Sequence, residues 1–178
     1  MKNLKDIIIE RLHINKDTGN HDSHYNYHPK TKAELKELIY KLIKERGNDA
    51  NLNDIDTSEI TDMFQLFVNS KFNGDISEWD VSNVETMEEM FMGSYFNGDL
   101  SNWDVSNVKN MNSMFANSDF NGDISNWDVH NVKYMGTMFY NSKFNGDISN
   151  WDVSNVNYFT SIFSYSPLEK NPPKWYKN

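Results

Sequence analysis

The residues of this chain best suited to chemistry are two sets of aspartates that recur every 24 residues. One set follows Asn-Gly and the other follows a tryptophan; together they are Asp75, Asp99, Asp123, Asp147, Asp80, Asp104, Asp128 and Asp152. Stacked carboxylates can hold calcium between the turns of a repeat protein. Aspartates next to a glycine or a helical turn also accept hydrogen bonds from local backbone amides. Because the Gly-Gly-x-Gly-x-Asp spacing of calcium-binding repeats is absent, we favour the second interpretation.

Three histidines, His21, His24 and His28, lie close to Asp22 in the sequence. Their spacings of three and four would suit a metal site on a helix. Residues 15–30 are polar and contain a proline near their end, which predicts an irregular loop. We therefore interpret the histidines as part of a solvated loop, and we expect neither a metal nor a cofactor.

A tryptophan also recurs at the same point of each block, as Trp79, Trp103, Trp127, Trp151 and Trp175. An exposed column of this kind would be a stacking platform for sugars or bases. Strict recurrence in every block favours a buried ladder instead. The chain shows no nucleophile, base and orienting group in a recognisable set and no glycine-rich phosphate loop, so we expect no enzymatic activity.

A 24-residue block positions all of these residues. It opens at Phe72, Phe96, Phe120 and Phe144, each followed by Asn-Gly-Asp. A fixed period of this size is typical of repeats that stack into an elongated array. We expect the chain to comprise an N-terminal helical cap over 1–47, a degenerate first coil over 48–71, full repeats over 72–167 and a truncated last coil over 168–178.

Within one block the pattern predicts a short strand followed by a short helical turn. Ile76 and residues 79–81 suit very short strands, and Ser82 or Asn83 can cap a helical turn. The apolar residues that follow are spaced as on one face of a helix: Val84, Met87, Met90 and Phe91. Neither element can bury its apolar side alone, so we expect the units to stack into a right-handed α/β repeat solenoid.

The N-terminal region predicts the cap. Residues 1–14 have the spacing of an amphipathic helix, and 31–46 predict a second helix. Thr31 and Glu34 form a capping box at its start, and Gly47 marks its end.

Charge is distributed unevenly along the chain, which has a formal net charge of -9. Residues 48–167 contain 4 basic and 18 acidic side chains. An acidic surface repels phosphate, so we expect no direct binding of nucleic acid and a protein partner with a basic surface. The chain has no cysteine, no membrane-spanning stretch and no apolar run long enough for a signal peptide, so we expect a cytoplasmic protein.

The block Phe-Asn-Gly-Asp-Ile-Ser-x-Trp-Asp-Val-Ser-Asn-Val-x-x-Met-x-x-Met-Phe resembles the repeat of bacterial BspA-like leucine-rich-repeat surface proteins. The resemblance extends over roughly residues 48–176, and the helix before them resembles the segment that precedes such repeats. It implies a leucine-rich-repeat-like solenoid with a binding role, and it supplies no catalytic residues.

Partner choice would depend on the positions that vary between blocks, because packing does not determine them. We select as candidate contacts Glu78, Glu85, Glu88, Glu89, Tyr95, Lys109, Asp119, His130, Tyr134, Tyr140 and Tyr158. The main hypothesis is a non-enzymatic protein-binding module, monomeric or weakly dimeric, with an acidic repeat surface. The alternatives are a phage or mobile-element inhibitor of a nucleic-acid-handling defence enzyme, similar to an anti-CRISPR mimic of nucleic acid, and a surface adhesin fragment.

Overall fold

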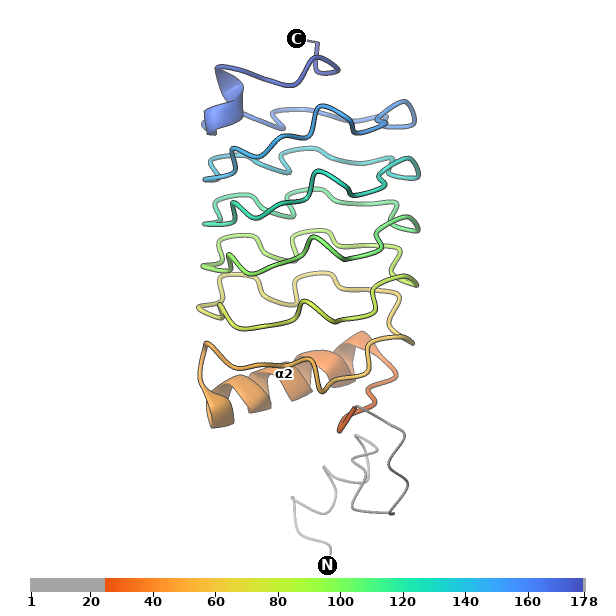
Figure 1. The fold of residues 1–178 in the computed structure, drawn as a ribbon, viewed down its shortest axis with the longest axis vertical. Helices are drawn as coiled ribbons and strands as arrows, with labels where there is room; N and C mark the ends of the chain where they lie inside the picture. The colour runs from red at the N-terminus through yellow and green to blue at the C-terminus, as the bar shows by residue number, and fades with distance from the viewer. Residues whose placement is uncertain (1–24, 178) are drawn as a thin grey trace, which may run out of the picture.

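The N-terminal part of the structure is a single α-helix laid across one end of a stack of coils (Figure 1). The computed structural model describes residues 25–177. Helix α2 (Lys32–Arg46) has the predicted N-cap and end: Thr31 Oγ1 accepts a hydrogen bond from Glu34 N at 3.3 Å, and Gly47 N donates to Ile43 O at 2.8 Å. The second bond of the predicted capping box differs, because the Glu34 carboxylate accepts from Lys30 N at 2.7 Å instead of from Thr31 N. Its buried side chains pack against the first coil. The helix predicted over 1–14 lies outside the described residues.

From residue 48 the chain winds through successive coils of 24 residues (Figure 1). Isolated parallel bridges connect the same position of consecutive coils, running from Asp62 through Thr86, Asn110 and Tyr134 to Tyr158. The 3₁₀ helix η1 (Pro167–Glu169) begins the incomplete last coil. Among residues 25–177, no strand is longer than such a bridge.

The segment after Glu85 differs from the short helical turn expected there. Every second backbone N–H donates to a carbonyl of the next coil, at 2.9 to 3.0 Å for Met87, Glu89 and Phe91. A helix would need these N–H groups for its own carbonyls, so tight turns form instead. Glu89 accordingly has a left-handed φ of 54°.

Columns of aromatic rings fill the core between the two long sides of each coil. Phe67, Phe91 and Phe115 stack on one another with ring centroids 5.4 and 5.7 Å apart. Phe91 also meets Trp103 from the opposite side of the coil, at 6.4 Å. One continuous core cluster extends from Leu35 in α2 to Leu168 in η1.

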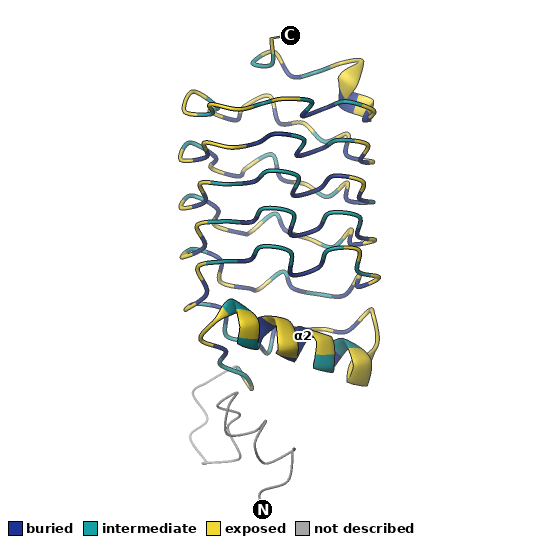
Figure 2. Cartoon of the chain, turned by 180° about the vertical axis from the view of Figure 1, so that it is seen from behind, coloured by how far each residue is buried: buried dark blue, intermediate teal, exposed yellow. Residues whose placement is uncertain are grey.

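Because the two sides of a coil bury their apolar residues against each other, their remaining side chains point to opposite broad faces. Burial alternates along the coils accordingly (Figure 2). We call one the turn face; it is formed by residues 61–71, 85–95, 109–119, 133–143 and 157–167. The other is the aspartate face, formed by residues 48–60, 72–83, 96–107, 120–131 and 144–155.

Candidate functional site

Nine of the eleven candidate contact residues lie on the turn face; Glu78 and His130 lie on the aspartate face. The turn face is not strongly acidic, because its segments contain five acidic and four lysine side chains. Lys109 Nζ lies 2.9 Å from a carboxylate oxygen of Glu85, and Lys143 Nζ lies 2.7 Å from Asp119. The structure therefore separates the acidic surface from most of the variable residues that the sequence analysis assigned to it.

The other two glutamates of the turn face are also engaged by neighbouring coils. Glu88 accepts a hydrogen bond from Asn110 Nδ2 at 3.0 Å, and Glu89 accepts one from Gln65 Nε2 at 2.5 Å. These hydrogen bonds hold one oxygen of each carboxylate against a neighbouring coil, although a neutral amide does not remove the negative charge.

Exposed tyrosines are concentrated on the C-terminal coils of the turn face. Tyr134 and Tyr158 occupy the same position of adjacent coils and are 46% and 49% exposed. Tyr140 and Tyr165 meet edge to face, with ring centroids 5.4 Å apart, and Tyr165 is 70% exposed. We call these four residues the tyrosine pairs. The second pair spans 25 residues, so the 24-residue period did not predict it.

Gly136 allows the Tyr158 ring to lie flat on this surface. A Cβ at this position would meet ring carbons of Tyr158 at 2.4 and 2.6 Å. The glycine N–H donates to Asn112 Oδ1 at 2.7 Å, which fixes the backbone under the ring. Gly136 is not among the residues predicted from the sequence, although within 72–167 only Gly93 and Gly136 do not follow an asparagine.

On the aspartate face the recurring carboxylates bind their own backbone. Asp99 Oδ1 accepts from Ser101 N at 2.9 Å, and the pattern recurs in the other blocks. The pKa of Asp99 is lowered by this N–H first and by the Ser101 hydroxyl second, and both outweigh the raising effects of desolvation and of repulsion from Asp123 and Asp75. The carboxylates thus serve as turn acceptors, the interpretation that the sequence favoured. Among residues 25–177, no group of three or more His, Asp and Glu is arranged to hold a metal ion.

Asparagine side chains connect the coils of the aspartate face, which the sequence analysis did not predict. Asn97 N donates to Asn73 Oδ1 at 2.8 Å, and the same bond links the next two coils at 2.7 Å. A second column uses Asn107 Nδ2, which donates to Ser82 O at 2.7 Å. Both asparagines recur every 24 residues, and this recurrence is the feature of the sequence that could have predicted the bonds between coils.

Four of the five recurring tryptophans are buried and are therefore no stacking platform, and Trp175 is partly buried. Trp79, Trp103, Trp127 and Trp151 are only 3 to 4% exposed. Each indole N–H donates to a carbonyl of the preceding coil, at 3.0 Å from Trp127 to Leu100. Of the predicted histidine group only His28 lies among the described residues; its Nδ1 lies 3.0 Å from Asp56 Oδ2. His130 Nδ1 lies 2.7 Å from Asp128 Oδ1.

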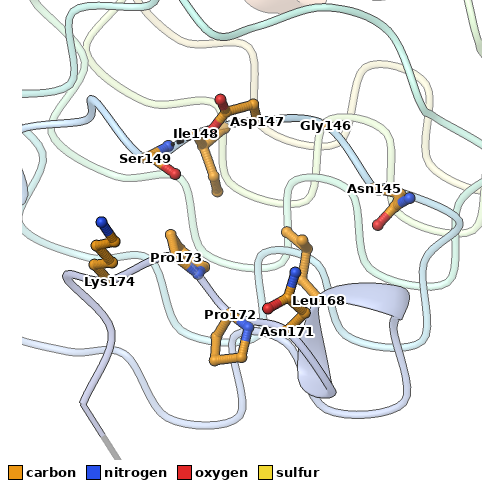
Figure 3. Close-up of a pocket in the computed structure, with 10 residues that line it drawn as sticks. All are labelled: Asn145, Gly146, Asp147, Ile148, Ser149, Leu168, Asn171, Pro172, Pro173 and Lys174. Carbon is orange, nitrogen blue, oxygen red and sulfur yellow. Dashed lines mark hydrogen bonds between the residues drawn. The ribbon is translucent and has the colours of Figure 1, made fainter.

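A hollow of about 430 Å³ separates the last full coil from the C-terminal segment (Figure 3). Pro172 and Pro173 have no N–H to donate to the preceding coil, although Trp175 Nε1 still reaches Ile148 O at 2.8 Å. The Ser149 N–H, followed by its hydroxyl, lowers the pKa of Asp147. Asp147 Oδ1 accepts from Ser149 N at 2.9 Å, so this carboxylate is a turn acceptor like the others of the aspartate face.

Comparison with known protein families adds one finding. A family model described as a Mycoplasma protein of unknown function, DUF285, matches residues 34–142 and again 96–176. The chain belongs to this family. The two matches overlap over 96–142, as expected for a repeat that can be aligned in more than one register, and the first begins inside α2. No curated protein and no solved structure matches the chain. Among residues 25–177 of this DUF285 member, no helix has the length and apolar content needed to cross a bilayer.

Proposed function

We propose that this DUF285 member is a non-enzymatic protein-binding module, built as a right-handed, leucine-rich-repeat-like solenoid of the BspA-like kind. The 24-residue block and the stacked coils support this assignment of the fold. The observation that carries the binding role is the presence of the tyrosine pairs on the turn face. Tyrosine offers a large contact area at low entropic cost and is enriched among the residues that dominate binding energy.

The turn face suits recognition for a second reason. Its side chains change from coil to coil, whereas the aspartate face repeats. The position of Tyr134 is held by Asp62, Thr86, Asn110 and Tyr158 in the other coils. Exposed tyrosines in a monomer need an explanation when several lie on one face, and a protein partner provides it.

A second candidate function uses the aspartate face. Residues 72–83, 96–107, 120–131 and 144–155 contain nine carboxylates and no lysine or arginine. Such a surface would attract a basic groove that normally holds nucleic acid. This observation favours the inhibitor of a nucleic-acid-handling enzyme as the alternative.

Matched variants separate the two functions. The tagged chain would be used to capture partners from lysate of the source cell, with nuclease added. Tyr134→Ser with Tyr158→Ser should abolish capture under the main proposal. Asp123→Asn with Asp147→Asn keeps the turn acceptors and removes two charges, and it should leave capture unchanged.

The opposite pattern, together with release by moderate salt, would replace the main proposal by the inhibitor. Retention on cell-surface material, with no effect of either pair of changes, would contradict both.

A further inference from the structure

The coils of the turn face are joined by a ladder in which donors and acceptors point in fixed directions. Met135, Thr137 and Phe139 donate their backbone N–H groups to carbonyls of the next coil at 3.1, 2.9 and 3.0 Å. The same arrangement joins every earlier pair of coils. Each coil therefore presents a row of N–H donors toward the C-terminal end of the stack, preceded by one carbonyl acceptor, such as Lys133 O, which accepts from Asn157 N at 2.9 Å.

This ladder ends at the coil of residues 157–167. The equivalent N–H groups belong to Phe159, Ser161 and Phe163, and they have no acceptor among residues 25–177. We call these three donors the C-terminal edge. The incomplete last coil supplies no carbonyl to these three donors; its Trp175 Nε1 bonds to Ile148 O on the aspartate side. Phe159 and Ser161 are partly exposed, whereas Phe163 is 2% exposed because Trp175 and Tyr176 pack against its ring, with centroids 5.8 and 5.1 Å away. An N–H without an acceptor gains free energy from one, and unpaired N–H groups at low exposure are rare in proteins.

A fourth donor of the series shows what kind of group fits there. Tyr165 N, the next in line, donates to the carboxylate oxygen Oε2 of Glu169 at 3.0 Å. The chain thus places one of its own oxygens where a carbonyl of the next coil would lie.

A second copy of the chain does not complement this edge. Two C-terminal edges brought together would set donors against donors. The other end of the stack lies against α2, where Lys36 Nζ donates to Gln65 O at 3.2 Å. Among residues 25–177 nothing supplies the row of acceptors that would complement this edge.

We propose that the C-terminal edge binds an extended peptide segment of a partner protein through the backbone carbonyls of that segment. This inference rests on the proposed protein-binding function and specifies how a partner is held. Addition of a strand-like peptide to an open edge is an established mode of recognition. Phe159 and Trp175 are partly buried side chains at this end of the core, so apolar residues at alternate positions of the peptide would cover them.

The test uses a peptide with the sequence of residues 132–143, which offers such carbonyls in the fold: Gly136 O and Met138 O accept from the preceding coil. The probe is titrated into the isotope-labelled full chain, and amide hydrogen exchange is followed by NMR. We expect Phe159, Ser161 and Phe163 to exchange at least tenfold more slowly with peptide. The amides of Met135, Thr137 and Phe139 are the internal control and should be protected throughout.

A peptide of the same composition, ordered so that its apolar residues no longer alternate, keeps the carbonyls but cannot cover Phe159 and Trp175, so it should bind more weakly. Absence of binding at millimolar peptide, or binding that leaves the three amides unprotected, would overturn the proposal. Protection that grows with protein concentration without peptide would identify a second copy as the occupant and would also overturn it.

Glu169→Ala provides a second readout by freeing the Tyr165 amide. One further neutral hydrogen bond should tighten peptide binding by about twofold to tenfold, and an unchanged affinity would contradict the donor-edge account. Failure of the proposed protein-binding function can be told apart from failure of this inference. The test of that function changes tyrosine side chains of the turn face and leaves the backbone donors of the C-terminal edge in place.

Discussion

The two broad faces of the stack share one core and one period, yet they are stabilised differently. On the aspartate face, side chains close hydrogen bonds to backbone: Asp99 to Ser101 within a coil and Asn73 to Asn97 between coils. On the turn face the recurring bonds between coils join backbone to backbone, and side-chain bonds such as that from Gly136 N to Asn112 Oδ1 do not recur in every coil. The sequence of the aspartate face is constant because its side chains make these hydrogen bonds. The exposed side chains of the turn face differ between coils, so they are the ones suited to recognising a partner.

Backbone conformation differs in the same way. Within 48–177, every residue with a left-handed φ lies on the turn face, including the β-branched Thr137 at 54°. A β-branched residue adopts this conformation only where its surroundings impose it. Here the inter-coil ladder imposes it, because the donors must point along the stack.

The largest effect should come from the core that both faces share. Trp127→Ala removes a ring that is 4% exposed and the hydrogen bond to Leu100 O. We expect the free energy of unfolding to fall by about 3–5 kcal/mol. Tyr134→Ala on the turn face should change it by less than about 0.5 kcal/mol. Urea unfolding followed by circular dichroism measures both, and equal effects would break the distinction between core and recognition surface.

A glycine from each face gives the next test. A Cβ at Gly74 would lie 2.0 Å from Ala50 O, a backbone atom, so Gly74→Ala should destabilise by about 1–3 kcal/mol. A Cβ at Gly136 meets the Tyr158 ring, which can turn toward solvent, so Gly136→Ala should be milder. Thermal unfolding of the two variants ranks them. A larger destabilisation by Gly136→Ala than by Gly74→Ala would show that the backbone of the aspartate face accommodates an added methyl group more easily than the turn face does.

The asparagine ladder should have a smaller effect. Asn121→Ala leaves Asn145 N without the acceptor that it finds at 2.7 Å, and because this bond is exposed to water the loss should be about 0.5–1 kcal/mol. Asn126 is exposed on the same face, and Asn126→Ala serves as the control with little expected change. Chemical denaturation of both proteins provides the comparison, and no difference between them would remove the bonding explanation for this face.

Lowering the pH should produce the smallest of these changes in stability, and it acts through the aspartate face. The pKa values of Asp99, Asp123 and Asp147 lie below the ordinary value in the folded chain, chiefly because serine N–H groups bind the carboxylates. A lowered folded pKa contributes stability above the unfolded value, and this stability is lost as the pH falls through the folded pKa.

We therefore expect the urea midpoint to decline below about pH 4. Replacing the three aspartates with asparagine should flatten that decline. A midpoint that rises on acidification would mean that repulsion within the columns outweighs the turn bonds.

Local signals in the sequence predicted part of this molecule well. Thr31 and Gly47 bound α2 because capping depends on near neighbours only. The aspartate turns were favoured for the same reason. The spacing of Met87, Met90 and Phe91 predicts a helical turn because it fits one face of a helix. The prediction is wrong because alternate N–H groups of this segment donate to the next coil, which the spacing of apolar residues does not indicate.

The candidate surface was predicted less completely. The prediction assigns the net charge of residues 48–167 to a single acidic surface. Counting the charges of the two halves of each block separately shows that the excess of carboxylates belongs to the aspartate face. Tyr134 and Tyr158 follow the period, whereas the contact of Tyr140 with Tyr165 depends on how a turn bends and needed the structure.

The central claim is that the turn face contacts the partner and the aspartate face does not. Site-specific photo-crosslinking in the source cell tests it most directly, with the photoreactive residue placed at Tyr158 in one protein and at Asn126 in the other. The account predicts a discrete crosslinked protein from Tyr158 and none from Asn126. A discrete crosslink from Asn126 alone would contradict it.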